Sequence, residues 1–228
     1  MNKIVALLLF TLVIKSGFGQ NTSSPQNYTK TFDLISDSFD LSGKTKIGNL
    51  RGNSVDIGSF TLSHLFNSFW NNANKQGANS FTVDSIIHHG DTTYIEISIY
   101  SLNEAELKTN RDKYPRNKIY VFGNIDKRQA SKKIKINDIK IELKPLEYVS
   151  YQNQVAEETI VSIGASRGAK MWIIGKEGRQ PMYLSANGSG HNGVSYAHTG
   201  TMSFNRGRIP PVDFNFGAFL VKVLLEKQ

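Results

Sequence analysis

The stretch SFTLSHLFNSFWNNANKQ, residues 59–76, decides the fold, because no other part of the chain has so clear a helical pattern. Its apolar residues recur every three or four positions, along one stripe of an α-helix. These residues are Leu62, Leu65, Phe66, Phe69, Trp70 and Ala73. Ser59 or Thr61 is suited to cap the start of the helix, and Gly77 is suited to the left-handed turn that ends it. We expect the stripe to cover a β-sheet.

The residues around this helix are typical of strands. We expect a short strand at 46–50, a strand at 80–87 and a strand at 92–102, with the last two joined by a turn at residues 88–91. Alternation places Phe81, Val83, Ser85 and Ile87 on one face of the first hairpin strand. It places Ile95, Ile97 and Ile99 on one face of the second. The order predicts a β-α-β-β unit over residues 46–102.

Residues 103–117 are polar and charged, and we interpret them as a linker or a short surface helix at a domain boundary. Beyond them, glycines separate short apolar runs, which predicts an antiparallel β-sandwich-like or small barrel unit over residues 118–228. In residues 132–143 the lysines alternate with the isoleucines, so we expect a hairpin with one face exposed to water. The expected strands span 118–122, 132–143 as this hairpin turning at Asn137-Asp138, 147–151, 158–163, 169–174, 181–184 and 214–225. A Gly-rich loop, residues 185–208, precedes the last one. The whole is an α+β, β-rich fold.

The first residues have the pattern of a secretory signal peptide. Lys3 precedes an apolar run over residues 4–14, and a small-x-small site at 17–19 predicts cleavage between Gly19 and Gln20. The run is too short to cross a bilayer as a helix, and no transmembrane span is expected after signal removal. Residues 20–45 are interpreted as a flexible leader. The chain has no cysteine, which excludes disulfides and a lipoprotein anchor on cysteine. We therefore expect an exported protein, periplasmic or secreted.

The charge of the chain is basic. Loss of Lys3 and Lys15 with the signal peptide lowers the formal net charge from +8 to +6. Twelve basic residues face six acidic ones between residues 103 and 145. Such a surface is able to meet an acidic glycan or another polyanion, and the alternative is a solvated face of a strand-rich domain. Nucleic acid is a less fitting partner, because no aromatic–arginine stacking pattern accompanies the lysines.

Two segments resemble uncharacterised exported bacterial envelope proteins. The junction Gly77-Ala78-Asn79, where a helix leads into a strand, resembles that of small envelope domains with a β-α-β-β core. The second half resembles a β-sandwich-like envelope domain at residues 119–121, 134–141, Tyr148 and 178–184. These resemblances imply a fold and a location in the bacterial envelope. They imply no reaction, and no catalytic residue is carried over.

Few residues have a pattern that indicates chemistry. His88, His89 and Asp91 share one turn and could hold a metal ion together with His191 or His198 from the long loop, although the spacing matches no established ligand pattern. Ser162 and Ser166 lack the glycine that a nucleophile elbow requires. Trp172 and Tyr183 are expected in the core, with a ligand groove as the alternative. No catalytic residue and no cofactor are expected.

The sequence therefore favours a non-catalytic, exported binding or assembly module of unknown ligand. Its partner would be an envelope protein or an acidic glycan. One alternative is a secreted hydrolase that acts on polysaccharide or peptidoglycan. Another is an adhesin-like surface protein that uses the loop at residues 185–208.

Overall fold

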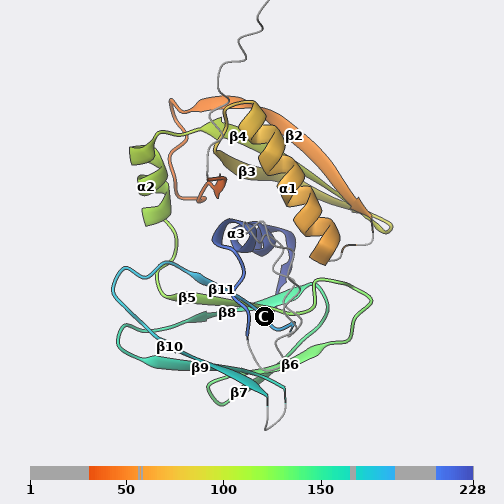
Figure 1. Ribbon diagram of the computed structural model, residues 1–228, viewed down its shortest axis with the longest axis vertical. Coiled ribbons are helices and arrows are strands. Elements are labelled where there is room, and N and C mark those ends of the chain that lie inside the picture. The colour runs from red at the N-terminus through yellow and green to blue at the C-terminus, as the bar shows by residue number, and fades with distance from the viewer. Residues whose placement is uncertain (1–30, 56, 58, 165–167, 188–208, 228) are drawn as a thin grey trace, which may run out of the picture.

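The computed structural model describes residues 31–55, 57, 59–164, 168–187 and 209–227 of the chain. Within these residues it contains three helices and three four-stranded sheets, so the expected α+β, β-rich fold is confirmed. None of the helices in the described ranges is long and apolar enough to cross a membrane. Figure 1 shows a helix-covered sheet above a two-sheet sandwich.

The first sheet has the order β1-β3-β4-β2. Its strands are β1 (Asp33–Leu34), β2 (Thr45–Val55), β3 (Ser80–His89) and β4 (Thr92–Ser101). Helix α1 (Ser59–Lys75) lies across this sheet (Figure 1) and buries the predicted stripe, with Leu62, Phe66 and Ala73 fully inaccessible. Trp70 is half-buried against the same core. Burial of each large side chain contributes about 1.5–3 kcal/mol, so the stripe holds the helix on the sheet.

The Gly-Ala-Asn junction after α1 has a clear structural role. Gly77 adopts the left-handed conformation with φ +78°, as predicted, and Ala78 is fully buried. The Asn79 side chain donates to the Leu102 carbonyl at 2.7 Å and accepts from the Leu102 amide at 2.9 Å. This pair of buried hydrogen bonds fixes the end of β4 to the start of β3.

The hairpin differs from the prediction in two ways. Its turn is Gly90-Asp91 rather than residues 88–91, because β3 continues through His89. A bulge between Val83 and Ser85 shifts the register, which reverses the alternation along β3. Ile86 therefore packs against the core, while Ile87 is 59% exposed, contrary to expectation. The prediction for β4 is confirmed, with Ile95, Ile97 and Ile99 buried.

Part of the segment expected to be a flexible leader belongs to the folded core. Within residues 20–45, the structure describes 31–45, and there β1 pairs in parallel with β3. Phe32 and Ile35 are almost fully buried, and the Phe32 ring stacks on Phe81 with centroids 4.4 Å apart. These contacts anchor residues 32–35 against α1 and β3.

Residues 103–117 contain a helix, α2 (Glu104–Asp112), as one of the two alternatives predicted. Asn103 and Glu106 form a capping box, in which each side chain accepts a hydrogen bond from the other residue's backbone amide. Along the chain, α2 separates the strands of the first sheet from those of the sandwich. The domain boundary expected here remains a prediction.

The sandwich consists of the sheets β11-β5-β8-β12 and β10-β9-β6-β7. Its strands are β5 (Lys118–Phe122), β6 (Lys132–Ile136), β7 (Ile139–Leu143), β8 (Glu147–Gln152), β9 (Glu158–Ile163), β10 (Ala169–Ile174), β11 (Met182–Ser185) and β12 (Leu225–Glu226). Val121, Ile134, Val161 and Leu184 are among the residues buried between the two sheets. Strands β11 and β12 pair in parallel with β5 and β8, so one sheet is mixed rather than purely antiparallel.

The predicted closing strand at residues 214–225 is wrong. Residues Phe214–Val223 form helix α3, and only Leu225–Glu226 are extended. Asp213 caps the helix by accepting from the amides of Asn215 and Phe216. Phe216, Phe219, Leu220 and Val223 are its buried stripe.

Helix α3 lies between α1 and the β11-β5-β8-β12 sheet (Figure 1). The Phe219 ring is 5.3 Å from the Phe66 ring of α1, and Phe214 meets Tyr183 edge-on at 5.6 Å. A single aromatic cluster therefore joins the helix-covered sheet to the sandwich. The β11-β5-β8-β12 sheet is covered on both faces, which leaves the outer face of β10-β9-β6-β7 as the open face of the sandwich.

Candidate ligand-binding groove

The outer face of β10-β9-β6-β7 begins with the β6–β7 hairpin, in which lysines alternate with isoleucines. Asn137 adopts φ 52°, the left-handed conformation that a tight hairpin turn requires. Ile134 and Ile136 point into the sandwich core, so Lys133 and Lys135 point outward. The predicted wet face of this hairpin is confirmed.

The strand register aligns further lysines with this hairpin. Lys135 pairs with Lys140 of β7 on one side and with Ser162 of β9 on the other. Ser162 in turn pairs with Lys170 of β10. Directly paired residues lie on the same face, so three lysines and one serine form a row across four strands. Lys133 lies on the same face, two residues along β6 from Lys135.

This face is hollowed into a groove of about 1110 Å³. The strand β9 contributes Ile160 and Ser162 to its lining, Gly164 follows directly after the strand, and Gly168 lies next to Gly164. These are short side chains apart from Ile160, whereas the neighbouring strands carry lysines. The groove is lined by Lys133, Ile134, Lys135, Asn137, Asp138, Lys140, Ile141, Glu142, Ile160, Ser162, Gly164, Gly168 and Lys170. A trough along β9 with lysine-bearing sides follows from this distribution of side-chain lengths.

The lysines of the groove have no ion partner among the described residues, whereas several cations elsewhere in the fold do. Arg51, Arg111, Arg116 and Lys222 each form a salt bridge within 3.0 Å. Among the described residues, no salt bridge involves Lys133, Lys135, Lys140 or Lys170. The groove also contains the carboxylates Asp138 and Glu142, so it carries more positive than negative charge but presents both.

Trp172 lies beside the groove on β10. It pairs with Ile160, which lines the trough, and it stands two residues from Lys170 on the same face. Its side chain is 58% exposed, so the expectation of a core position is wrong for Trp172. For Tyr183 the same expectation is confirmed, because Tyr183 is buried against α3. An exposed indole next to unpaired lysines gives the groove an apolar contact surface as well as charge.

The weak candidates for a metal site have other partners, point apart or lie outside the described residues. His88 Nδ1 is 2.8 Å from Thr93 Oγ1, and Asp91 pairs with Lys127. His88 and His89 are consecutive residues of β3, so they point to opposite faces of the sheet. His191 and His198 are not among the described residues, and neither are Gly19 and Gln20. Within the described residues, no group of three or more metal-binding side chains occurs.

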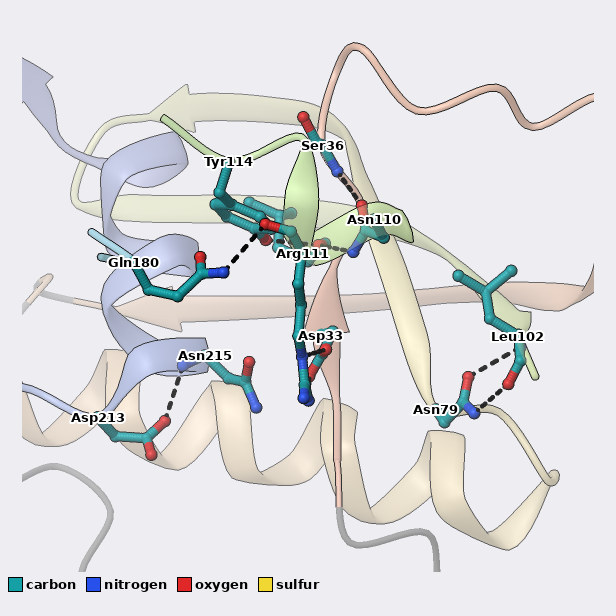
Figure 2. A network of polar contacts seen from close by, with 11 residues as sticks. Asp33, Ser36, Asn79, Leu102, Asn110, Arg111, Tyr114, Gln180, Asp213 and Asn215 are labelled. Carbon is teal, nitrogen blue, oxygen red and sulfur yellow. Dashed lines mark hydrogen bonds and ion pairs between the residues drawn. The ribbon is translucent and has the colours of Figure 1, made fainter. Parts of the chain in front are cut away.

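A second polar cluster lies between β1 and α2 (Figure 2). Asp33 is fully buried and accepts two hydrogen bonds from Arg111, at 2.7 and 3.2 Å. The Asn110 amide and the Tyr114 hydroxyl both donate to the Leu34 carbonyl, at 2.9 and 2.5 Å. All of these groups hold the β1 backbone to α2, so we assign the cluster a structural role.

The pKa values of the buried aromatic hydroxyls also indicate structural roles. Burial raises the pKa of Tyr114 and of Tyr183 well above the ordinary value. Burial and the charge of Glu226 raise the pKa of Tyr120 to about 12. These hydroxyls are neutral near pH 7 and are not poised as general bases. Hydrogen bonding to Asp33 raises the pKa of Arg111, which keeps the guanidinium charged.

Sequence reasoning found half of the groove. The alternation of lysine and isoleucine over residues 132–143 revealed the outward lysines of β6 and β7. The sequence did not show that Lys170 and Trp172 face the groove. Strand β10 has apolar residues on both faces, so its own sequence does not show which face is buried when it pairs with β9. Trp172 was the one residue that could have indicated this side of the groove, but the sequence analysis placed it in the core.

Comparison of the chain with models of known families, with curated proteins and with solved structures found no match in any of the three.

Proposed function

We propose that this protein is a non-catalytic binding module that holds an extended anionic polymer in the groove along β9. The observation that carries the proposal is the row of Lys140, Lys135 and Lys170 across three of the four strands, without ion partners among the described residues. Holding like charges together on one sheet face is unfavourable unless they are solvated or neutralised by a ligand.

The form of the groove favours a polymer over a small molecule. The groove is open along a sheet face rather than enclosed, and its lysines lie on both sides of β9. Small-molecule sites generally enclose most of the surface of their ligand, whereas an open trough leaves a chain free to enter and leave at its ends. Repeated anionic groups would meet successive lysines, which adds weak contacts into a useful affinity.

Export belongs to the same proposal. Signal-peptide features at residues 1–19 favour a protein outside the cytoplasm, in the periplasm or secreted, where anionic polymers of the cell envelope are within reach. The absence of cysteine is compatible with an oxidising compartment, since no thiol is present to be oxidised.

The test is the binding of purified protein to anionic polymers, compared between two double variants of equal charge. Lys135→Gln/Lys170→Gln removes two groove lysines, and Lys108→Gln/Lys113→Gln removes two exposed lysines in or beside α2. The quantity to measure is the Kd of wild type and of both variants for polygalacturonate, dextran sulfate, polyphosphate and oligo-dT, by isothermal titration calorimetry at two salt concentrations.

We expect the groove variant to weaken binding about 10- to 100-fold, since each lost ion contact is worth on the order of 1 kcal/mol in a solvated groove. We expect the α2 variant to bind within about twofold of wild type, because it changes only the net charge, which salt screens. Equal losses in both variants, or no binding of any polymer by the wild type, would refute the proposal.

A further inference from the structure

We propose that the polymer held in this groove is an acidic polysaccharide, with its anionic groups on the lysines and one sugar ring stacked on Trp172. This inference rests on the proposed function and adds the chemical class of the ligand. Three features of the groove carry it: the exposed indole, the mixture of charges and the width of the trough.

The exposed indole supplies the first argument. Trp172 is 58% exposed, and Ile174, two residues further on the same face, is 51% exposed. A flat apolar indole beside hydrated lysines suits a ligand that is itself apolar on one side and polar at its edges. A sugar ring has that form, since its C–H groups gather on one face and its hydroxyls radiate outward. Polyphosphate offers no such face.

The mixture of charges supplies the second argument. Asp138 and Glu142 line the groove together with the lysines, and the Ser162 hydroxyl lies in the lysine row. Carboxylates accept hydrogen bonds and need a ligand that donates them. The hydroxyls of a sugar donate to Asp138 and Glu142 while its acidic groups meet the lysines. A phosphodiester backbone has no hydrogen-bond donor for either carboxylate.

The type of cation agrees with this assignment. The lining contains four lysines and no arginine among the described residues. Arginine presents a rigid fork that suits phosphate and stacks on nucleobases, whereas lysine is a flexible point charge. A groove selected for nucleic acid would gain from arginine at these positions. A glycan with anionic groups at variable orientation is served by lysine.

The width of the trough supplies the third argument. Lys135 and Lys170 stand on β6 and β10, with β9 between them. Two strand spacings separate their backbones by about 9.5 Å. A single polysaccharide chain fits between such sides, along β9, whereas a double helix is too wide to enter. The ring that passes Ile160 then lies next to Trp172.

The experiment uses the full mature protein and its tryptophan fluorescence. The chain has two tryptophans, of which Trp70 on α1 is half-buried against the core and Trp172 is exposed beside the groove. A ring stacked on Trp172 should shift its emission to shorter wavelength. The probes are polygalacturonate and dextran sulfate as acidic glycans, uncharged dextran, polyphosphate as charge without a ring, and oligo-dT as a single-stranded nucleic acid.

We expect both acidic glycans to bind and to shift the emission, with dextran at least tenfold weaker. Trp172→Ala should weaken the binding of acidic glycan about tenfold and abolish the shift, and Trp172→Tyr should restore part of the affinity. The matched control is Tyr94→Ala, at a half-exposed aromatic residue on β4 of the β1-β3-β4-β2 sheet. It should change neither the affinity for acidic glycan nor the emission shift. Polyphosphate affinity should not depend on Trp172.

Two results would overturn the inference while leaving the proposed function intact. One is polyphosphate binding as tightly as the acidic glycans, with no effect of Trp172→Ala on any polymer. The other is oligo-dT binding most tightly and depending on Trp172, which would identify a single-stranded nucleic acid as the ligand. Failure of every polymer to bind would instead refute the proposed function itself.

Discussion

At the scale of single residues, Asp33 is the buried charge on which the attachment of β1 depends. Its carboxylate is fully inaccessible, while the Arg111 side chain that satisfies it is 42% exposed. Asp33→Asn keeps the size of the side chain but removes the ion pair. We expect the free energy of unfolding, measured by urea denaturation at pH 7, to fall by about 1.5–3 kcal/mol, the range for hydrogen bonds to charged groups.

The matched control for this prediction is Asp112, which lies on α2 next to Arg111. Asp112 pairs with Arg116 four residues later, and both side chains are partly exposed. Asp112→Asn should therefore cost about 0–1 kcal/mol, as surface ion pairs generally do. If the two variants lose equal stability, the buried pair contributes no more than a surface pair, and our account of β1 is wrong.

For single residues, the sequence predicted some side-chain orientations correctly and others wrongly. Lys133 and Lys135 were placed outward correctly, because a hairpin with isoleucine at every second position has only one face to bury. Ile87 was placed wrongly, because one inserted residue at the Asp84 bulge reverses the alternation and leaves no mark on the pattern. Trp172 was placed wrongly, because apolar residues on both faces of β10 leave the choice of face to its partner strand.

At the scale of elements, α1 and α3 show when periodicity decides. The stripe of α1 fits only a helix, and it was predicted correctly. The sequence of α3 fits two periods, since Phe219, Val221 and Val223 alternate while Phe216, Phe219, Leu220 and Val223 follow a helical repeat. Valines and Gly217 favour a strand or a break, and burial between two sheets overrides this local preference.

The seat of α3 depends on close contact at Gly217. A Cβ atom added there would lie 2.6 Å from the Tyr183 Cβ and still closer to the ring, so the helix would have to move. Glycine to alanine in a helix normally stabilises by about 0.5–1 kcal/mol. We expect Gly217→Ala to do the opposite and to lower the free energy of unfolding by about 1–3 kcal/mol, as overpacking does.

The control is Gly48→Ala in β2, where the nearest atom to the added Cβ is Gln76 Oε1 at an ordinary contact distance of 3.8 Å. That variant should match wild type or be slightly more stable, since alanine restricts the unfolded chain. A stabilising effect of Gly217→Ala in urea denaturation would show that α3 is not packed against β11 as described.

At the scale of the whole molecule, the sequence predicted the parts and their order but not their assembly. The helix-covered sheet and the sandwich were each recognised from local patterns. Their shared aromatic cluster was not, because it joins residues 32, 66, 122 and 219, which no local window contains. The groove shares this limit, since its two sides come from strands about 35 residues apart and meet only through β9.

The shared cluster makes the whole fold sensitive to alkali. Burial raises the pKa of Tyr114, Tyr148 and Tyr183 above the ordinary value near 10, and raises that of Tyr120 to about 12. A raised pKa in the folded state gives stability that is fully present below pH 10, the ordinary value. This stability is lost as the pH rises through the folded-state value, because ionised tyrosine is tolerated only when the chain unfolds. We therefore expect the free energy of unfolding to fall steeply between pH 10 and about 12.

Urea denaturation at a series of pH values measures this loss, and tyrosinate absorbance reports when the hydroxyls ionise. The hidden tyrosines should ionise together with the loss of near-ultraviolet circular dichroism, in one cooperative step. Tyr120→Phe keeps the ring but removes one hydroxyl that titrates, so its stability should decline less over this range. Tyr94→Phe, at a half-exposed position on β4, should lose stability over this pH range as wild type does. Gradual ionisation of all tyrosines near pH 10 without unfolding would mean that water reaches the aromatic cluster. In that case α3 would not exclude water from the contact between the helix-covered sheet and the sandwich.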